Sequence, residues 1–237
     1  MAVYAISDLH LALGVDKPMD IFGNKWQDYM EKTQVLWKES VSNEDFIIVP
    51  GDISWATYLN EAYKDFKYIE NLPGKKIILK GNHDYWWTTA RKLEAYLAEN
   101  NFKTINFLHN NCFITEKFAI CGTRGWKCPG DDDFKEDDEK IYAREVQRLE
   151  LSLNSYIKTI PENGEREIIV ALHYMPFNSK TETSGFVDLM QKYKVKMCIY
   201  GHLHGEGAKN AIIGELEGIK YILVAADHLN FKPIIIS

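Results

Sequence analysis

The sequence predicts an α/β protein, and three observations lead to this prediction. Five short apolar runs of strand type lie at residues 3–6, 46–49, 77–79, 168–172 and 197–200. Each run stops at polar side chains that can bind a metal or move a proton. Segments with apolar residues at helical spacing separate several of the runs. Because ligands of open α/β sheets bind beyond the carboxyl ends of the strands, we expect the five ends to form one crevice.

The remaining elements follow from periodicity and turn residues. An imperfect amphipathic helix is expected over residues 26–38, and a second helix begins after Thr57 as N-cap and stops before Pro73-Gly74. Thr88 or Thr89 would cap a third helix. Residues 104–122 predict two or three short strands, and residues 134–160 predict the longest helix, whose acidic start matches the helix dipole. Strands and turns then alternate over residues 211–216, 220–225 and 233–236.

Composition limits the class of protein. With 237 residues, 46% of them hydrophobic, the chain can bury a full core, and no change of composition marks a linker, so we expect a single domain over residues 1–237. We expect no membrane span, no leader segment and a cytoplasmic location. Four Cys without a CxxC pair indicate reduced, packed thiols. The net charge of −6 argues against nonspecific nucleic-acid binding but is compatible with a nucleotide substrate.

The polar residues at the strand ends form the candidate site. They are Asp8, His10, Asp52, Asn82, His83, Asp84, His173, His202 and His204. One His at a strand end is more often a hydrogen-bonded structural residue than a ligand, but five of the seven His in this chain are placed alike. The spacing of Asp8 and His10, and of His202 and His204, directs both side chains of a pair to one side of an extended backbone.

This donor set predicts two metal ions. Imidazole and carboxylate without thiolate favour Mn, Fe, Zn, Co or Ni over Ca or Mg, and we favour manganese. Seven of the nine residues are candidate ligands, more than the roughly four to six that one ion takes, so the set predicts two ions. Two neighbouring cations need a bridging anion between them. Asp52, alone on its loop after Gly51, which lets the backbone come close, is the natural bridge. Two divalent ions against Asp8 and Asp52 leave an excess positive charge, which matches a phosphate ester.

Five motifs in this order resemble the calcineurin-like metallophosphoesterase family: Asp8-x-His10, Gly51-Asp52, Gly81-Asn82-His83-Asp84, His173 and Gly201-His202-x-His204. The resemblance implies a four-layer αββα sandwich of two mixed β-sheets flanked by helices, with the active site at the carboxyl ends of the strands. It implies that Asp8, His10, Asp52 and His204 hold one metal. The second would be held by Asp52, Asn82, His173 and His202, while His83 would contact the substrate phosphate and aid the leaving group, with Asp84 orienting it.

Aromatic residues accompany the motifs. We assign Trp55, and one of Trp86 and Trp87, to core packing; the others could wall a cleft that stacks a base. Arg124, Trp126 and Lys127 form the candidate substrate-binding loop, since neighbouring Gly and Pro make it irregular and its cations can meet a phosphate or carboxylate.

Two functions remain open on the sequence. The first is a phosphatase or phosphodiesterase in which a metal-bridging hydroxide attacks the phosphorus of a small mono- or diester and His83 assists departure. The second is a metal-binding interaction module that keeps the fold without catalysis. Complete ligand sets together with His83 favour the enzyme.

Overall fold

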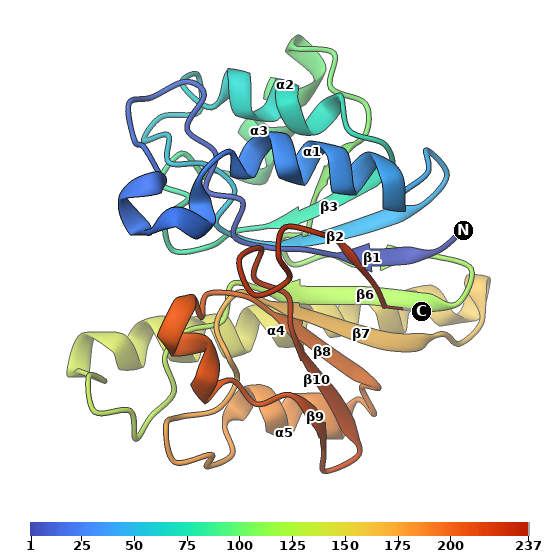
Figure 1. Cartoon of the computed structure of the whole chain (residues 1–237). Helices are drawn as coiled ribbons and strands as arrows, with labels where there is room; N and C mark the ends of the chain where they lie inside the picture. The colour runs from blue at the N-terminus through green and yellow to red at the C-terminus, as the bar shows by residue number, and fades with distance from the viewer. Residues whose placement is uncertain (237) are drawn as a thin grey trace. The chain divides into compact units, whose positions relative to one another are not determined.

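The computed structural model describes residues 1–236, and the chain divides into two compact units. Unit 1 comprises Met1–Phe107 and Val224–Ser237, and unit 2 comprises Leu108–Leu223. Each unit contains one β-sheet with its own helices (Figure 1). A single domain over residues 1–237 stays a prediction.

The sheet of unit 1 has five strands in the order β11-β1-β2-β3-β4. Strands β1 to β4 are parallel, and β11 pairs antiparallel with β1. Their bounds are β1 (Val3–Ala5), β2 (Phe46–Pro50), β3 (Lys75–Leu79), β4 (Ile105–Phe107) and β11 (Ile234–Ile235). Because parallel strands all run in one direction, the segments that follow β1, β2 and β3 leave the same edge of this sheet.

Three helices accompany this sheet, and Figure 1 shows them on one side of it. They are α1 (Tyr29–Ser40), α2 (Tyr63–Glu70) and α3 (Ala90–Glu99), and two 3-10 turns, η1 (Asp20–Phe22) and η2 (Asn24–Trp26), precede α1. One hydrophobic cluster joins both layers. It includes Trp37, Phe66 and Leu93 from the helices and Ile47 and Val49 from β2, all fully buried. Burial of such side chains, each worth about 1.5–3 kcal/mol, fixes the strands whose ends carry the polar motifs.

Two helix starts differ from the prediction. Helix α1 begins at Tyr29, three residues after the expected start. Helix α2 begins at Tyr63, so the predicted N-cap at Thr57 is wrong. The carboxylate of Glu61 accepts hydrogen bonds from the backbone N–H groups of Thr57 and Tyr58, each at 3.1 Å, and holds this stretch in a turn. The Glu61 side chain thus satisfies these two backbone N–H groups within a turn, and the helix begins only after it.

The sheet of unit 2 has six strands in the order β5-β6-β7-β8-β10-β9. Strands β6, β7, β8 and β10 are parallel, while β5 and β9 pair antiparallel at the two edges. Their bounds are β5 (Phe113–Ile114), β6 (Phe118–Thr123), β7 (Glu167–Leu172), β8 (Met197–Tyr200), β9 (Gly214–Leu216) and β10 (Ile219–Leu223). The segments after β6, β7 and β8 thus leave one common edge of this second sheet.

Two helices belong to unit 2, with the 3-10 helix η3 (Gly205–Asn210). The long helix α4 (Glu136–Asn163) packs against β6 and against α5 (Gly185–Lys192). Acidic residues fill the first turn of α4, as expected for the positive end of its dipole. Helix α5 was not anticipated from the sequence. Its N-cap is Ser184, whose hydroxyl accepts a hydrogen bond from the backbone of Val187 at 3.4 Å.

The predicted class, α/β with two mixed sheets and flanking helices, is confirmed. The thiols agree with the sequence as well, because Cys112, Cys121, Cys128 and Cys198 are all free. Burial raises the pKa of Cys128 to about 12, so this thiol is held in its neutral form. No helix within residues 1–236 is both long and apolar enough to cross a membrane.

Candidate metal centre

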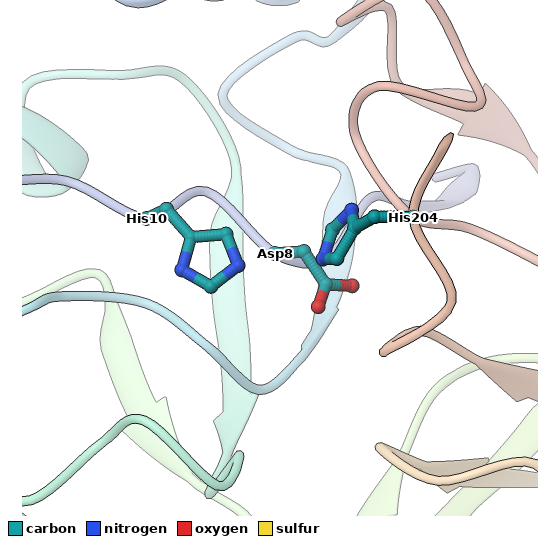
Figure 2. A group of neighbouring side chains, drawn as sticks. All are labelled: Asp8, His10 and His204. Atoms are coloured by element: carbon teal, nitrogen blue, oxygen red, sulfur yellow. The ribbon is translucent and has the colours of Figure 1, made fainter. Parts of the chain in front are cut away.

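The segment that follows β1 carries Asp8 and His10, both drawn in Figure 2. Asp8 is fully buried and His10 is 4% exposed. Their ligand atoms lie within 4.8 Å of each other, so the predicted convergence of the pair is present. The reason differs from the expected one. Both residues have left-handed backbones, with φ of 59° and 44°, so it is a bent loop and not an extended strand that aims them together.

Asp52 occupies the corresponding place after β2. It is 1% exposed and left-handed, with φ of 52°. A carboxylate oxygen of Asp52 lies within 4.8 Å of a carboxylate oxygen of Asp8, and Asp52 Oδ2 lies 3.7 Å from His10 Nε2. Two buried carboxylates this close repel each other unless a cation or a proton neutralises them. With the imidazole of His10 they make a nitrogen and oxygen donor set that fits a divalent transition metal.

Gly81 brings the end of β3 against the Asp52 loop. A Cβ at this position would lie 2.1 Å from Asp52 Oδ1 and 2.3 Å from the Asp52 backbone nitrogen, so only glycine permits the contact. The sequence pointed to Gly51 for close approach. Gly51 instead supplies a turn with φ of 86°, and Gly81 supplies the approach.

Asn82 and His83 follow Gly81 and are both half-buried. The backbone N–H of His83 donates a 2.8 Å hydrogen bond to Asp52 Oδ1, and His83 Nε2 lies 3.9 Å from Asp52 Oδ2. The side chain of His83 is 34% exposed, in contrast to the nearly buried Asp52 beneath it. This imidazole can therefore reach a molecule from solvent while it stays beside the candidate bridging carboxylate.

Asp84 is fully buried and organises the loops around Asp52. Its Oδ1 accepts from the backbone of Ile53 at 2.8 Å and of Ser54 at 3.2 Å, and from Trp86 Nε1 at 3.1 Å. Its Oδ2 accepts from the backbone of Gly81 at 2.7 Å and of Asp52 at 2.9 Å. Through these bonds the carboxylate holds the backbone of the Asp52 loop. That Asp84 orients His83 stays a prediction.

Burial, followed by the charge of Asp52, raises the pKa of Asp84 to about 7, while hydrogen bonds from backbone N–H groups lower it. All five partners are donors and none accepts a proton, so they favour the ionised carboxylate.

Unit 2 carries the remaining three candidate ligands. His173 follows β7 directly and is fully buried. His202 and His204 follow β8, and both are half-buried; His204 is drawn in Figure 2. The rings of His173 and His202 are 5.0 Å apart between centroids, in an edge-to-face arrangement. His202 has a left-handed backbone with φ of 69°, and the ring of Tyr174 lies 4.2 Å from it.

The candidate substrate-binding loop follows β6, and its residues already have protein partners. Arg124 is 13% exposed in its side chain and pairs with the buried Glu145 at 3.3 Å, with its guanidinium 4.3 Å from the Trp126 ring. Trp126 Nε1 donates to Asp138 at 2.8 Å. Lys127 forms an ion pair with Asp133. A buried Arg paired with a buried Glu contributes to the structure of unit 2, and this use competes with substrate binding.

Lys127 also lines a cleft of about 480 Å³ in unit 2. Other residues along this cleft include Tyr174, Phe177, Asn178 and His202. The cleft therefore combines aromatic surface with polar groups beside one candidate ligand, as ligand sites commonly do.

Two residues near the candidate ligands were not identified from the sequence. The hydroxyl of Ser7 donates to Asp8 Oδ2, and its only sequence signal is its position directly before Asp8. Trp55 packs against the hydrophobic cluster of unit 1, as its assignment to the core predicted, but it is half-buried, and the contacts of its ring with His10 and His83 were not predicted. Trp86, in contrast, is 2% exposed and belongs to the core as expected.

Comparison with known families agrees with this donor set. The family model described as calcineurin-like phosphoesterase matches residues 1–206. The chain therefore belongs to the calcineurin-like phosphoesterase family. Membership makes it a phosphoesterase whose hydrolysis of phosphoesters depends on divalent metal ions.

Solved structures share the fold at low sequence identity. A phosphopantetheinyl hydrolase (PptH) from Mycobacterium tuberculosis is 13% identical, with a TM-score of 0.56 over 94% of this chain and 88% of the other. The protein TT1561 of Thermus thermophilus is 12% identical, with a TM-score of 0.52 over 85% of this chain and 81% of the other. Identities this low establish the fold alone. A search of the curated proteins finds no match to this chain.

Proposed function

We propose that this protein is a dinuclear phosphohydrolase that cleaves a small phosphate mono- or diester. The observation that carries the proposal is the buried carboxylate pair of Asp8 and Asp52, with the imidazoles of His10 and His83 both facing Asp52 Oδ2. A bound cation would neutralise a buried pair of this kind, and the exposed edge of His83 offers a proton donor beside it.

The ligand assignment follows the family resemblance. Asp8, His10, Asp52 and His204 would hold one divalent ion, and Asp52, Asn82, His173 and His202 the other. Bound divalent ions lower the pKa of a coordinated water to supply the nucleophile, and they neutralise the phosphoryl oxygens. Manganese is our favoured metal, with Fe, Zn, Co and Ni as alternatives of the same ligand preference.

His83 would act on the leaving group. Its backbone is tied to Asp52 Oδ1, which fixes where the imidazole stands, and its side chain keeps enough exposure to meet a substrate. A His in such a position can donate a proton to the departing oxygen, a contribution that is typically about 10²- to 10⁴-fold in rate. Asp84 would serve this step through the backbone that it holds.

The backbone at four candidate ligands has the conformation often found at functional sites. Asp8, His10, Asp52 and His202 all have positive φ, between 44° and 69°. Left-handed backbone costs a non-glycine residue roughly 1–2 kcal/mol. Strain of this kind gathers at active sites, where the geometry of the side chains outweighs its cost.

The substrate would be a small phosphoester, with nucleotide-like esters among the candidates. The cleft along Lys127, Tyr174 and His202 would take the part of the ester beyond the phosphate. Family membership over residues 1–206, which includes parts of both units, supports one domain over the whole chain. We propose a cytoplasmic location, with no nonspecific binding to nucleic acid at a net charge of −6.

Turnover of an aryl phosphate and of a bis-aryl phosphate by the Mn²⁺-loaded protein tests the proposal and separates monoesters from diesters. We expect hydrolysis that stops on chelation and returns with Mn²⁺. His10→Asn should abolish it, whereas His228→Asn, at an exposed His outside every motif, should not. Metal bound at normal content without turnover of either ester would favour the interaction module instead.

A further inference from the structure

Trp55 contacts two imidazoles of unit 1. Its ring lies 4.9 Å from that of His10 in a stacked arrangement and 4.4 Å from that of His83 at a tilt of 49°. The ring centroids of His10 and His83 are 5.6 Å apart. The three rings therefore form one cluster, with the indole against both imidazoles.

The indole is itself held in place. Its Nε1 donates to the sulfur of Met19 at 3.1 Å, and Lys17 Nζ lies 4.6 Å from the ring centroid. The Trp55 backbone N–H donates to the carbonyl of Leu11 at 2.9 Å, which joins the segment after β2 to the segment after β1. A side chain fixed at its backbone, its N–H and its face can orient a neighbour.

We propose that Trp55 is a positioning residue that holds the His83 imidazole at the angle needed to protonate the leaving group, an inference that rests on the proposed function. The indole N–H already has Met19 as its acceptor, so the face of the ring, and not its donor, meets His83. The side chain of His83 is 34% exposed, and the aromatic face packs on one side of the imidazole and restricts its rotation.

His10 should keep its place without Trp55. It is 4% exposed, packs edge-to-face on Trp26 at 5.9 Å and has Asp52 Oδ2 at 3.7 Å from its Nε2. Loss of the indole should therefore affect His83 and leave metal binding intact. This separates the role of Trp55 from that of a residue that only supports the ligands.

Three variants test the role on metal-loaded protein: Trp55→Ala, Trp55→Phe and the double variant Trp55→Ala with His83→Asn. Trp55→Ala should lower kcat by about tenfold to a hundredfold on an alkyl ester, the size of effect expected for a misplaced proton donor, with little change in KM. The loss should shrink on a nitrophenyl ester, whose leaving group departs without a proton. Trp55→Phe should stay within about threefold of wild type, because it keeps an aromatic face.

The double variant gives the most specific readout. If Trp55 acts through His83, adding Trp55→Ala to His83→Asn should cost no further activity, since coupled residues are not additive. Tyr96→Ala is the matched control: Tyr96 is half-buried in the same unit but packs on Phe66 and Phe102, away from the polar motifs, and its loss should not change kcat.

Additive losses in the double variant, an equal defect on both esters, or reduced metal content in Trp55→Ala would each overturn the role of Trp55. If Trp55→Ala does not fold, Trp55→Phe decides, because it keeps an aromatic ring at this position. A Trp55→Phe protein with normal metal content and a defect as large as that of His83→Asn would contradict the role. A wild-type protein that turns over no ester would overturn the proposed function itself.

Discussion

Replacing Asp84 by Asn removes one charged oxygen from a carboxylate that serves five donors. Oδ1 accepts from Ile53, Ser54 and Trp86, and Oδ2 accepts from Gly81 and Asp52. An Asn side chain has the same shape but only one acceptor oxygen. Placed to keep the three bonds of Oδ1, it points its amide N–H₂ at the backbone N–H groups of Gly81 and Asp52.

The expected loss of stability follows from those two bonds. A hydrogen bond to a charged group contributes about 1.5–3 kcal/mol, so two of them amount to at most about 3–6 kcal/mol. Asn offsets part of this loss because it carries no charge, whereas burial and the charge of Asp52, which raise the pKa of Asp84, disfavour the ionised carboxylate. The opposite orientation of the amide would lose three bonds and cost more. Because domains of this kind unfold at a cost of about 5–15 kcal/mol, the substitution should remove a large part of the stability.

Urea unfolding of the metal-free protein at about pH 8.5, where a carboxylate with a pKa of about 7 is ionised, measures this loss directly. Metal-loaded Asp84→Asn, assayed where it is folded, should also lose activity because the Asp52 backbone is released. A destabilisation below about 1 kcal/mol would refute the reasoning from hydrogen bonds.

Asp45→Asn is the matched control for this experiment. Asp45 is 8% exposed and accepts backbone bonds from Ala2 at 2.8 Å and Ser42 at 2.9 Å, before the start of β2 and away from the polar motifs. Its substitution should cost about 1.5–3 kcal/mol, the value of one such bond, and leave kcat unchanged. Loss of activity in both variants would mean that general destabilisation, and not release of the Asp52 loop, explains the effect.

Three further predictions use other residues. Asp52→Asn should bind less than two Mn²⁺ per chain by elemental analysis and lose more activity than any terminal-ligand variant, because it removes the proposed bridging anion; near-normal turnover would show that Asp52 is not the bridge. His83→Asn should keep both metals and lose about 10²- to 10⁴-fold in rate on poor leaving groups and less on acidic ones; an equal defect across esters would mean that His83 mainly binds phosphate. Burial lowers the pKa of Lys76 to about 8, so the unfolded chain holds this proton more tightly above that pH. The free energy of unfolding should therefore rise by up to about 1.4 kcal/mol per pH unit from about pH 8 towards 10, and Lys76→Met should remove this rise; an unchanged slope would contradict it.

Much of the architecture could be predicted from local sequence alone. Apolar runs followed at once by Gly, Asp or His predicted the strands that end at the polar motifs, because burial on a sheet and exposure at its edge leave a short-range pattern. Helix boundaries were less well predicted. Thr57 is a good N-cap by residue type, but Glu61 holds its backbone in a turn and α2 starts at Tyr63.

The choice of candidate ligands also came from the sequence, since residue type and spacing determine which atoms can bind a metal. The sequence did not predict how those side chains are oriented. Asp8 and His10 converge through left-handed backbones, which no side-chain period predicts. The close approach came from Gly81 and not from Gly51, because it depends on which loop packs against Asp52.

The sequence by itself therefore determined the class of fold and the family, and it identified the candidate metal ligands. Only the tertiary structure decided what surrounds them. Asp84 binds the backbone of Asp52, 32 residues earlier, and Trp55 lies against His83 from the next strand end. Arg124, expected to meet substrate, pairs with Glu145 of α4. Each of these contacts joins segments far apart in the chain, and periodicity describes only which face of its own element a residue occupies, not which residue will lie opposite it.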